Sequence, residues 1–472
     1  MIAAAAVSVL LSAVALLPRP LVNNDGILYL AAAEVFAGDG FGAARAIHGW
    51  PFFSILIAGV AAVLRVSTEM AAHLIVSALI AAACAAFVAL ARELGGDRRV
   101  QWLAAAVVIA HPWLNRSRAL VVRDAGVWAF GLLALVILLR LDRAGRGREA
   151  LRWAACSAAA VLFRADAAVL MAAAPLALAL HRDLPRRERM TAAAALLAAT
   201  LPAVAGAAAW LLTDPVYTLS AAPFRAAAAA LASSFPLPYG REYAPFILAL
   251  GLAAVPVAKT VKALGVAHAA LAVMGMARGG PPSRFHRIAL GATLALAVLP
   301  LYVHAVRLLF VDSRYTVFAT LVLCAWAPFG LAWLLRASRL AAGLAAAALA
   351  ATLIVSVALR PPPDRHVREA ADWIRHNTGG ARLHTNSLQL AYHSGKPVDW
   401  HRVNNAAVYG AWDGAPLGEG DVWAVRVGPG EDAALRRLAQ VQKLQRGVSF
   451  TGPDGDAVFV YRCRAAACVS GS

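Results

Sequence analysis

The sequence has few charged residues and very few lysines, and these shortages nearly exclude a soluble single-domain enzyme. Of its 472 residues, only 15% are charged and 61% are hydrophobic, whereas soluble domains carry about 25% charged and about 45–50% apolar residues. Lysine occurs at four positions, so the net charge of +18 comes almost entirely from arginine. These arginines lie between long apolar runs, and they therefore indicate membrane orientation rather than a nucleic-acid partner.

The sequence also has few cysteines, and the five present do not form a disulfide framework. Cys84, Cys156 and Cys324 lie inside apolar runs, where a thiol behaves as a small hydrophobic group. Cys463 and Cys468 could pair if the C-terminus faces an oxidising compartment, and the sequence leaves this open. No cluster of His, Cys and Asp has metal-ligand spacing, so we expect no metal site and no cofactor.

Long apolar runs dominate the first 360 residues. Runs of about 20 residues predict transmembrane helices, and short loops rich in arginine predict the cytoplasmic side. Five such loops hold 17 of the 31 basic residues before Pro361. All five lie inside if the run at 50–64 is re-entrant or interfacial. The resulting prediction is an all-α polytopic membrane domain with a cytoplasmic N-terminus and eleven spans, at 2–22, 70–91, 100–115, 125–140, 151–164, 166–180, 191–212, about 260–277, 288–306, 315–335 and 340–359.

This topology divides the chain into a membrane domain, 1–360, and a C-terminal extramembrane domain, 361–472. Two outer regions of the membrane domain stand out, 23–69 and 213–259, and the second contains a candidate interfacial helix at 243–258. In the C-terminal domain, REAADWIRHN and EDAALRRLAQVQKL predict helices, and RLHTNS, VWAVRV and DAVFVYRC predict strands. We therefore expect a small α/β domain on the outer side.

Charged residues at the outer ends of the spans are candidate site residues, because charge near a bilayer is costly and commonly functional. Asp25 follows the first span, where it could act as a general base or as the N-cap of the next helix. Arg123 and Asp124 precede the fourth span, and an Arg–Asp neighbour pair is often only mutual neutralisation.

The same two interpretations apply to other outer arginines, which could bind an anion such as phosphate or could be snorkelling or paired residues. Arg164 lies beside Asp166 in VLFRADAAVL, and Arg307, Arg314 and Tyr315 lie at the outer start of the tenth span, in RLLFVDSRYTVF. Our topology brings these separate segments to one face of the membrane. This convergence indicates a site more strongly than any single residue does.

Several motifs resemble the C-type (GT-C) membrane glycosyltransferases, in particular the protein O-mannosyltransferases and the lipid A aminoarabinose transferases. In chain order they are NNDGILYLAAAEVFAGDG, HGWPFFSILIA, VVRDAGVWAF, LFRAD and DSRYTVF, followed in the tail by AYHSGKP. Members of this superfamily move a sugar from a polyprenyl-phosphate donor to an acceptor at the outer face of the membrane. The resemblance therefore implies the GT-C fold and a glycosyltransferase activity.

The resemblance also suggests roles for the candidate residues. Asp25 would be the catalytic base, Asp124 a second acidic or acceptor-orienting residue, and Tyr315 a contact of the sugar. Glu34 and Asp39 are equal candidates for an acidic partner of Asp25, and a divalent ion bridging Asp25 and the donor phosphate stays open. Phosphate or sugar contacts would come from Arg123, Arg164, Arg307 and Arg314.

The expected partners are the polyprenyl-phosphate sugar, membrane lipids and an acceptor that is a lipid, a glycan or a protein. Heavy use of alanine and arginine is typical of a GC-rich bacterium, so we expect a bacterial inner membrane with the tail in the periplasm or outside the cell. Two other classes remain open. One is a transporter or flippase of a lipid-linked sugar, and the other is a non-catalytic membrane scaffold.

Overall fold

The computed structural model describes residues 1–141, 146–213, 221–278, 283–358, 364–396, 421–429 and 445–462. Contacts divide the chain into two compact units. The first unit comprises Met1–Leu17 and Phe36–Leu359, and the second comprises Pro18–Val35 and Arg360–Ser472. The segment that follows the first helix therefore belongs to the same unit as the tail.

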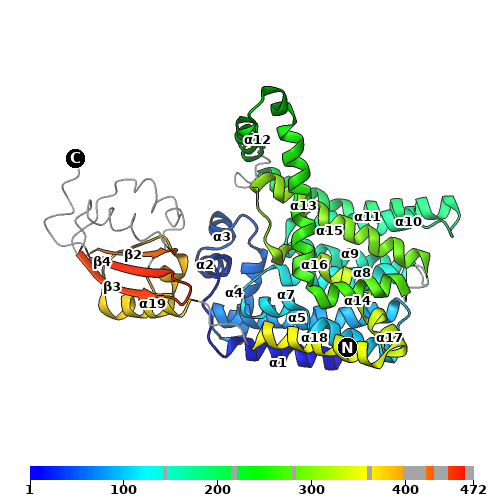
Figure 1. Cartoon of the computed structure of the whole chain (residues 1–472), viewed down its shortest axis with the longest axis horizontal. Coiled ribbons are helices and arrows are strands. Elements are labelled where there is room, and N and C mark those ends of the chain that lie inside the picture. Colours follow the sequence, from blue (N-terminus) through cyan, green and yellow to red (C-terminus); the bar gives the residue numbers. More distant parts are fainter. Residues whose placement is uncertain are drawn as a thin grey trace. The chain divides into compact units, whose positions relative to one another are not determined.

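The first unit is built from helices (Figure 1). Its first half contains α1 (Ile2–Leu16), α3 (Phe41–Ile47), α4 (Phe52–Leu64), α5 (Thr68–Glu93), α6 (Arg98–Ile109), α7 (Pro112–Arg116), η1 (Ser117–Ala119), α8 (Asp124–Arg140) and α9 (Arg146–Phe163). Its second half contains η2 (Ala165–Ala172), α10 (Ala173–Ala179), α11 (Arg186–Thr213), α12 (Ala222–Ser234), η4 (Pro238–Tyr243), α13 (Ala244–Leu264), α14 (Val266–Arg278), α15 (Arg284–Leu308), η5 (Ser313–Thr316), α16 (Val317–Cys324), α17 (Ala327–Ala337) and α18 (Arg339–Val357).

Helix α8 is enclosed by the rest of this unit. Fourteen of its 17 side chains are buried, and it packs against α5, α9, α15 and α16. Gly126 lets the Phe163 ring approach, since a Cβ there would lie 2.0 Å from the ring. The N-terminus of α8 is thereby held at a fixed place among these helices.

Helices α14 and α17 approach each other through two glycines. A Cβ on Gly330 would lie 2.1 Å from the carbonyl oxygen of Leu271, and a Cβ on Gly275 would lie 1.9 Å from that of Trp326. Small residues allow this backbone contact, which is a common device between membrane helices.

Five helices in the described part of the chain are long and apolar enough to cross a membrane, and a bent pair, Ser313–Cys324 with Ala327–Ala337, makes six if it counts as one span. The five are Thr68–Glu93, Arg186–Trp210, Pro238–Leu264, Arg284–Leu308 and Arg339–Val357. The expected number of about eleven is therefore not confirmed. Several predicted spans consist of shorter helices: α1 ends at Leu16, before Pro18 and Pro20, and α7 begins at Pro112, inside the predicted span 100–115.

Two predicted segments have different bounds in the structure. The segment 243–258 lies within Pro238–Leu264, which is long enough to span, so its prediction as a short interfacial helix is wrong in length. The predicted span at about 260–277 is wrong as one helix, because α13 ends at Leu264 and α14 begins at Val266. The break falls at Gly265, whose φ of 73° suits glycine. Helix α13 itself continues through Pro256.

The second unit contains a four-stranded sheet with the order β1-β2-β4-β3. Its strands are β1 (Leu383–Thr385), β2 (Val422–Val427), β3 (Gln445–Thr451) and β4 (Ala457–Arg462), and its helices are α19 (Arg365–Asn377) and α20 (Leu388–His393). Strands β1 and β2 are parallel, whereas β4 is antiparallel to both β2 and β3. Helix α19 lies along the sheet (Figure 1) and buries Val367, Ala370 and Ile374 against it.

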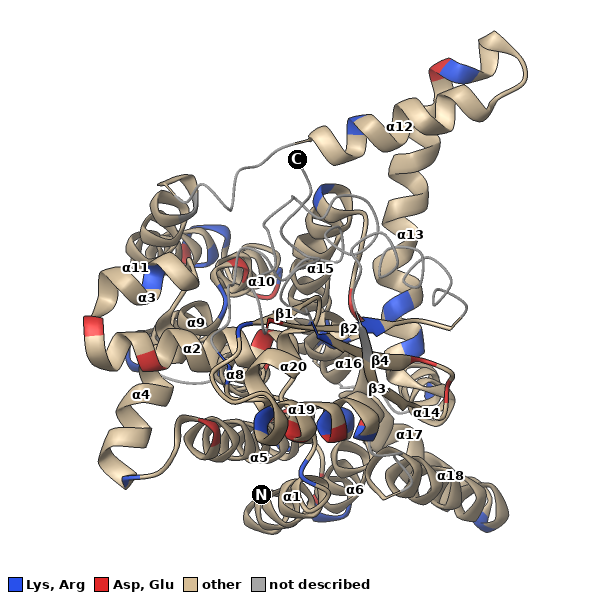
Figure 2. Ribbon diagram, turned by 90° about the vertical axis from the view of Figure 1, so that its left-hand side faces the viewer, with Lys and Arg blue, Asp and Glu red and all other residues tan. Residues whose placement is uncertain are grey.

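The predicted small α/β domain is confirmed in its described part. The predicted helix corresponds to α19, and the three predicted strands correspond to β1, β2 and β4. Strand β3 and helix α20 were missed, because neither has a long alternating or amphipathic pattern. The second predicted helix, EDAALRRLAQVQKL, and both Cys463 and Cys468 lie outside the described residues. Along α19, basic and acidic residues alternate on the exposed side (Figure 2).

The segment Pro18–Val35 is tied to the tail by core packing and hydrogen bonds. Leu21 belongs to the hydrophobic core beneath α19. The Val22 amide donates to Nε2 of His393 over 3.1 Å, and Gln389 donates to the Val22 carbonyl. Burial, helped by the charges of Arg368 and Arg375, lowers the pKa of His393 to about 4. The ring is therefore neutral at pH 7 and can accept this hydrogen bond.

Candidate functional site

The first unit brings two acids and one arginine together where α8 begins and α9 ends. Asp124 is the first residue of α8, and Arg164 lies in extended conformation between α9 and η2. Arg164 donates from Nη1 to Asp124, from Nε to Oδ1 of Asp166 at 2.9 Å, and from Nη2 to Oδ2 of Asp166 at 2.6 Å. Asp124 is only 4% exposed. Burial of a carboxylate is costly, and these hydrogen bonds to a guanidinium offset that cost.

Tyr315 joins this cluster from a third segment of the chain, the short helix η5. The guanidinium carbon of Arg164 lies 4.7 Å from the centre of the Tyr315 ring, and that of Arg314 lies 5.0 Å from it. Arg314 also donates from Nη2 to the Tyr315 hydroxyl over 3.1 Å. Asp312 accepts a hydrogen bond from the Arg314 amide and so caps η5. Both guanidinium groups therefore lie within cation–π distance of the Tyr315 ring.

His304 of α15 completes the same region. Its ring meets the Tyr315 ring edge-on, with the two centres 5.2 Å apart. Charges on Arg164, Asp166, Arg307 and Arg314 all act on this imidazole. Arg307, in the last turn of α15, therefore lies near the cluster. No sequence motif indicated His304.

Arg123 contacts a different partner, His48 in the loop between α3 and α4. Its Nη1 lies 3.1 Å from Nε2 of His48. Burial and the charge of Arg123 lower the pKa of His48 to about 3, so this ring is neutral at pH 7. A neutral imidazole can accept a hydrogen bond from the guanidinium.

The loop that carries His48 is fixed by its neighbour Trp50. The Trp50 indole donates to the carbonyl of Leu162, 2.9 Å away, close to the end of α9 and two residues before Arg164. The Trp210 indole donates to the Gly49 carbonyl, and the Trp50 and Trp210 rings meet edge-on. The HGW motif thereby positions its loop next to the residues of the cluster.

A small cavity opens beside the cluster. Its volume is about 40 Å³, and Asp124, Arg164, Asp166 and Tyr315 supply its polar wall. A binding pocket for a small molecule usually measures about 300–1,000 Å³, so this cavity is far smaller than a typical ligand pocket.

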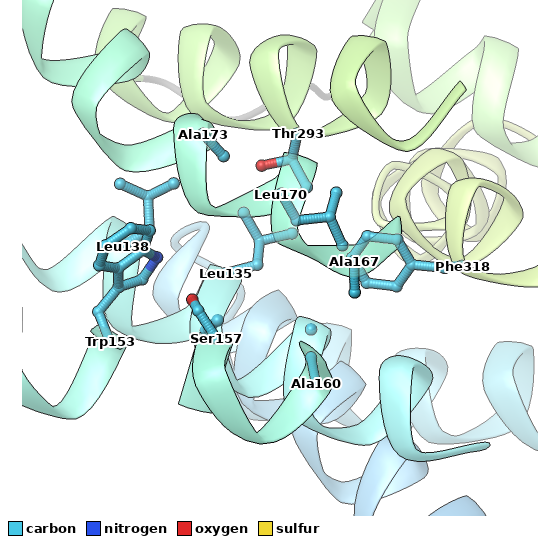
Figure 3. A pocket seen from close by; sticks show the side chains of 12 residues that line it. Leu135, Leu138, Trp153, Ser157, Ala160, Ala167, Leu170, Ala173, Thr293 and Phe318 are labelled. Carbon is cyan, nitrogen blue, oxygen red and sulfur yellow. The ribbon is translucent and has the colours of Figure 1, made fainter. Parts of the chain in front are cut away.

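A second cavity of about 20 Å³ lies behind η2 and shares Ala167, Leu170 and Phe318 with the first. Figure 3 shows these side chains with the hydroxyls of Ser157 and Thr293 on opposite walls. Apart from these two hydroxyls, its lining is largely apolar, so this cavity adds no charged group to the cluster.

Arg118, five residues before Arg123, is a further arginine of this part of the chain, and it is buried. It is 1% exposed, and it donates to the Ser8 carbonyl at 2.7 Å, to the hydroxyls of Ser8 and Ser12, and to Oδ1 of Asn115. These contacts tie η1 to α1. Arg118 is therefore a structural residue of the first unit.

The structure thus brings together Asp124, Arg164, Arg314 and Tyr315, with Arg307 near them and Arg123 on His48. Asp25 lies in the first turn of α2 (Asn24–Asp39), is half-buried, and belongs to the second unit. Because α2 begins at Asn24, Asp25 lies inside the helix rather than at its N-cap. Sequence reasoning missed His48 and His304 as members of the site. For His48, the only available signal was its place in the HGW motif.

Comparison with known proteins shows the fold. No protein-family model and no curated protein matches the chain. Among solved structures, it resembles ArnT from Cupriavidus metallidurans bound to undecaprenyl phosphate, with 13% identity, a TM-score of 0.58, and coverage of 100% of this chain and 99% of ArnT. It also resembles the oligosaccharyltransferase AglB from Archaeoglobus fulgidus in complex with an inhibitory peptide and a dolichol-phosphate, with 12% identity, a TM-score of 0.55, and coverage of 97% and 74%.

A third similar structure is the arabinofuranosyltransferase AftD from Mycobacteria, with 18% identity, a TM-score of 0.50, and coverage of 98% of this chain and 41% of AftD. All three are GT-C glycosyltransferases. The chain therefore has the fold of the GT-C superfamily, as its motifs had suggested.

Proposed function

We propose that the protein is a membrane glycosyltransferase that moves a sugar from a polyprenyl-phosphate donor to an acceptor at the outer face of a bacterial inner membrane. The observation that carries this proposal is the cluster of Asp124, Arg164, Arg314 and Tyr315, assembled from three separate segments on a GT-C fold. Two of the similar structures contain a polyprenyl-type phosphate, which supports the same class of donor here.

The donor phosphate would be recognised by arginines close to the cluster. Arg123, Arg307 and Arg314 fill this role in our proposal, because a guanidinium binds phosphate through charge-assisted hydrogen bonds. Arg164 differs, since its Nε, Nη1 and Nη2 already donate to carboxylates. We therefore assign Arg164 to the positioning of Asp124 rather than to direct phosphate contact.

The reaction would be a single displacement at the anomeric carbon of the sugar. The acceptor hydroxyl oxygen forms the new bond to that carbon, and the bond from the carbon to the phosphate oxygen breaks. Asp25 would take the hydroxyl proton as general base, while the arginines stabilise the negative charge on the departing polyprenyl phosphate. Asp124 would orient the acceptor, and Tyr315 would contact the sugar. The acceptor itself can be a lipid, a glycan or a protein.

Asp25→Asn and Arg314→Ala test these roles in purified protein supplied with a polyprenyl-phosphate sugar. Asn keeps the shape of Asp, so Asp25→Asn is expected to lower the transfer rate by about 10²–10⁴-fold with donor binding nearly unchanged. Arg314→Ala should chiefly weaken donor binding, because its contacts already exist before the reaction. Arg225→Ala, which changes an arginine of α12, is the matched control and should change neither quantity.

Equal transfer rates for Asp25→Asn and wild type would remove Asp25 as the base. Transfer without any loss in Arg314→Ala would remove the proposed phosphate contact. If wild-type protein moves the lipid-linked sugar across a bilayer without transferring it, the protein is a transporter and the proposal fails.

A further inference from the structure

A separate group of potential metal ligands lies in the second unit, where α19 begins and where the turn from β3 reaches β4. Asp364 directly precedes α19, His366 is in its first turn, and Asp456 directly precedes β4. One ligand atom from each residue, two carboxylate oxygens and one imidazole nitrogen, lies within 4.8 Å of the others. Because about 90 residues separate His366 from Asp456, no local spacing of ligands indicates a metal site in the sequence.

His366 is the observation that points to a ligand. The residue is only 4% exposed, and among the described residues neither of its ring nitrogens has a hydrogen-bond partner. Its Nε2 lies 3.1 Å from Oδ2 of Asp456, but the arrangement does not form a hydrogen bond. A buried polar group without a partner is costly, and a bound cation would remove this cost.

Gly452 leaves space for the side chains of Asp456 and His366. A Cβ on Gly452 would lie 2.3 Å from Oδ1 of Asp456 and 2.7 Å from Nδ1 of His366. Any larger residue would therefore displace these two side chains. Only glycine lets the carboxylate and the imidazole come together at this point.

Arg426 of β2 sets the charge of the group. Its Nη2 donates to Oδ1 of Asp364 and, over 2.8 Å, to Oδ2 of Asp456. The guanidinium balances one of the two negative charges and fixes the orientation of both carboxylates, as outer partners of metal ligands commonly do. Each carboxylate has a second oxygen besides the one that accepts from Arg426.

We propose that Asp364, His366 and Asp456 bind one divalent transition-metal ion of the zinc class. One imidazole nitrogen with two carboxylate oxygens suits Zn²⁺, whereas Mg²⁺ and Ca²⁺ prefer oxygen ligands alone. The ion connects the start of α19 to the β3–β4 turn and so stabilises the second unit. It is independent of the transfer reaction.

Metal content of the purified full-length protein in detergent tests this site. Protein stripped with a chelator is titrated with ZnCl₂, and the bound zinc is counted by mass spectrometry. The variants are His366→Gln and Asp456→Asn. The control is His384→Gln, which removes a histidine of the same unit whose Nε2 lies 2.9 Å from a single carboxylate, that of Asp421.

We expect His384→Gln to bind as much zinc as wild type, and His366→Gln and Asp456→Asn to bind one equivalent fewer. The zinc affinity of this site should fall by more than about 100-fold, because mutation of a residue that only orients a metal ligand already lowers the affinity by about 10–100-fold. Zinc should also raise the unfolding temperature of wild type but not that of His366→Gln. Equal zinc binding by wild type and His366→Gln would overturn the proposal, leaving an ion-pair network centred on Arg426.

Co²⁺ provides a second measurement if the variants do not fold. Wild-type protein with one equivalent of Co²⁺ should show a visible absorption band. The width of its electron paramagnetic resonance signal should differ between protein that contains ¹⁵N-histidine and protein that contains ¹⁴N-histidine. No band at one equivalent, or no sensitivity to the histidine isotope, would likewise overturn the proposal.

Discussion

Arg164 supplies the positive charge for two carboxylates, so its replacement should cost more stability than the loss of either carboxylate. The side chain of Arg164 is 13% exposed and that of Asp124 is 6% exposed, whereas that of Asp166 is 42% exposed. Arg164→Gln therefore leaves Asp124 buried without its charged partner. Asp124→Asn leaves Arg164 still paired with Asp166.

The magnitudes follow from these exposures. Removing one partner of a buried ion pair costs about 3–5 kcal/mol, and this range applies to Arg164→Gln. Asp124→Asn keeps a polar group in place and should cost about 1–3 kcal/mol, the usual cost of a weakened buried hydrogen bond. Asp166→Asn should cost about 0–1 kcal/mol, because solvent screens an exposed pair.

Urea titration of the three variants in detergent measures their free energies of unfolding and so checks this order of stabilities. The double variant Arg164→Met with Asp124→Leu should recover part of the loss, because it removes both buried charges together. An Arg164→Gln variant as stable as Asp166→Asn would refute the argument. It would mean that the buried pair with Asp124 contributes little.

Three further predictions concern other contacts. Trp50→Phe should lower the free energy of unfolding by about 1 kcal/mol, because it loses the indole hydrogen bond to the end of α9. An unchanged free energy of unfolding in urea titration would contradict this prediction. Gly330→Ala should lower the free energy of unfolding by about 1–3 kcal/mol, because the added methyl group pushes α14 and α17 apart. Gly343→Ala, which has open space around it, should be neutral or stabilising. The pKa of His393 is lowered to about 4 in the folded protein, so the ring of the unfolded chain gains its proton first as the pH drops. The folded state should therefore lose stability between about pH 6.5 and about pH 4. The protection of the Val22 amide against hydrogen exchange should weaken over this range in wild type but not in His393→Gln.

The sequence could predict the parts of the fold that depend on local patterns. The amphipathic pattern of α19 and the apolar strands β2 and β4 identify the small α/β domain, and the positions of Asp124, Arg164 and Tyr315 beside apolar runs bring them to one face. The roles of these residues stay predictions. Their mutual contacts depend on where α8, α9 and η5 meet, which no local pattern specifies.

The parts that could not be predicted depend on long-range packing or on tolerated irregularities. Helix α13 continues through Pro256 because neighbouring helices stabilise it, although proline usually ends a helix. The association of Pro18–Val35 with the tail rests on the burial of Leu21 and on the contact with His393, hundreds of residues away. Apolar runs that break into short helices, such as α6 and α7, are one reason why the predicted number of spans is not confirmed.

Mass spectrometry of the lipids and glycans from a bacterium lacking this gene tests the central claim most directly. We predict that one sugar is missing from one product and that its polyprenyl-phosphate form accumulates. Wild-type protein should restore the product, and Asp25→Asn at equal abundance should not. An unchanged set of sugars in the deletion strain, or full restoration by Asp25→Asn, would contradict the proposed transfer reaction.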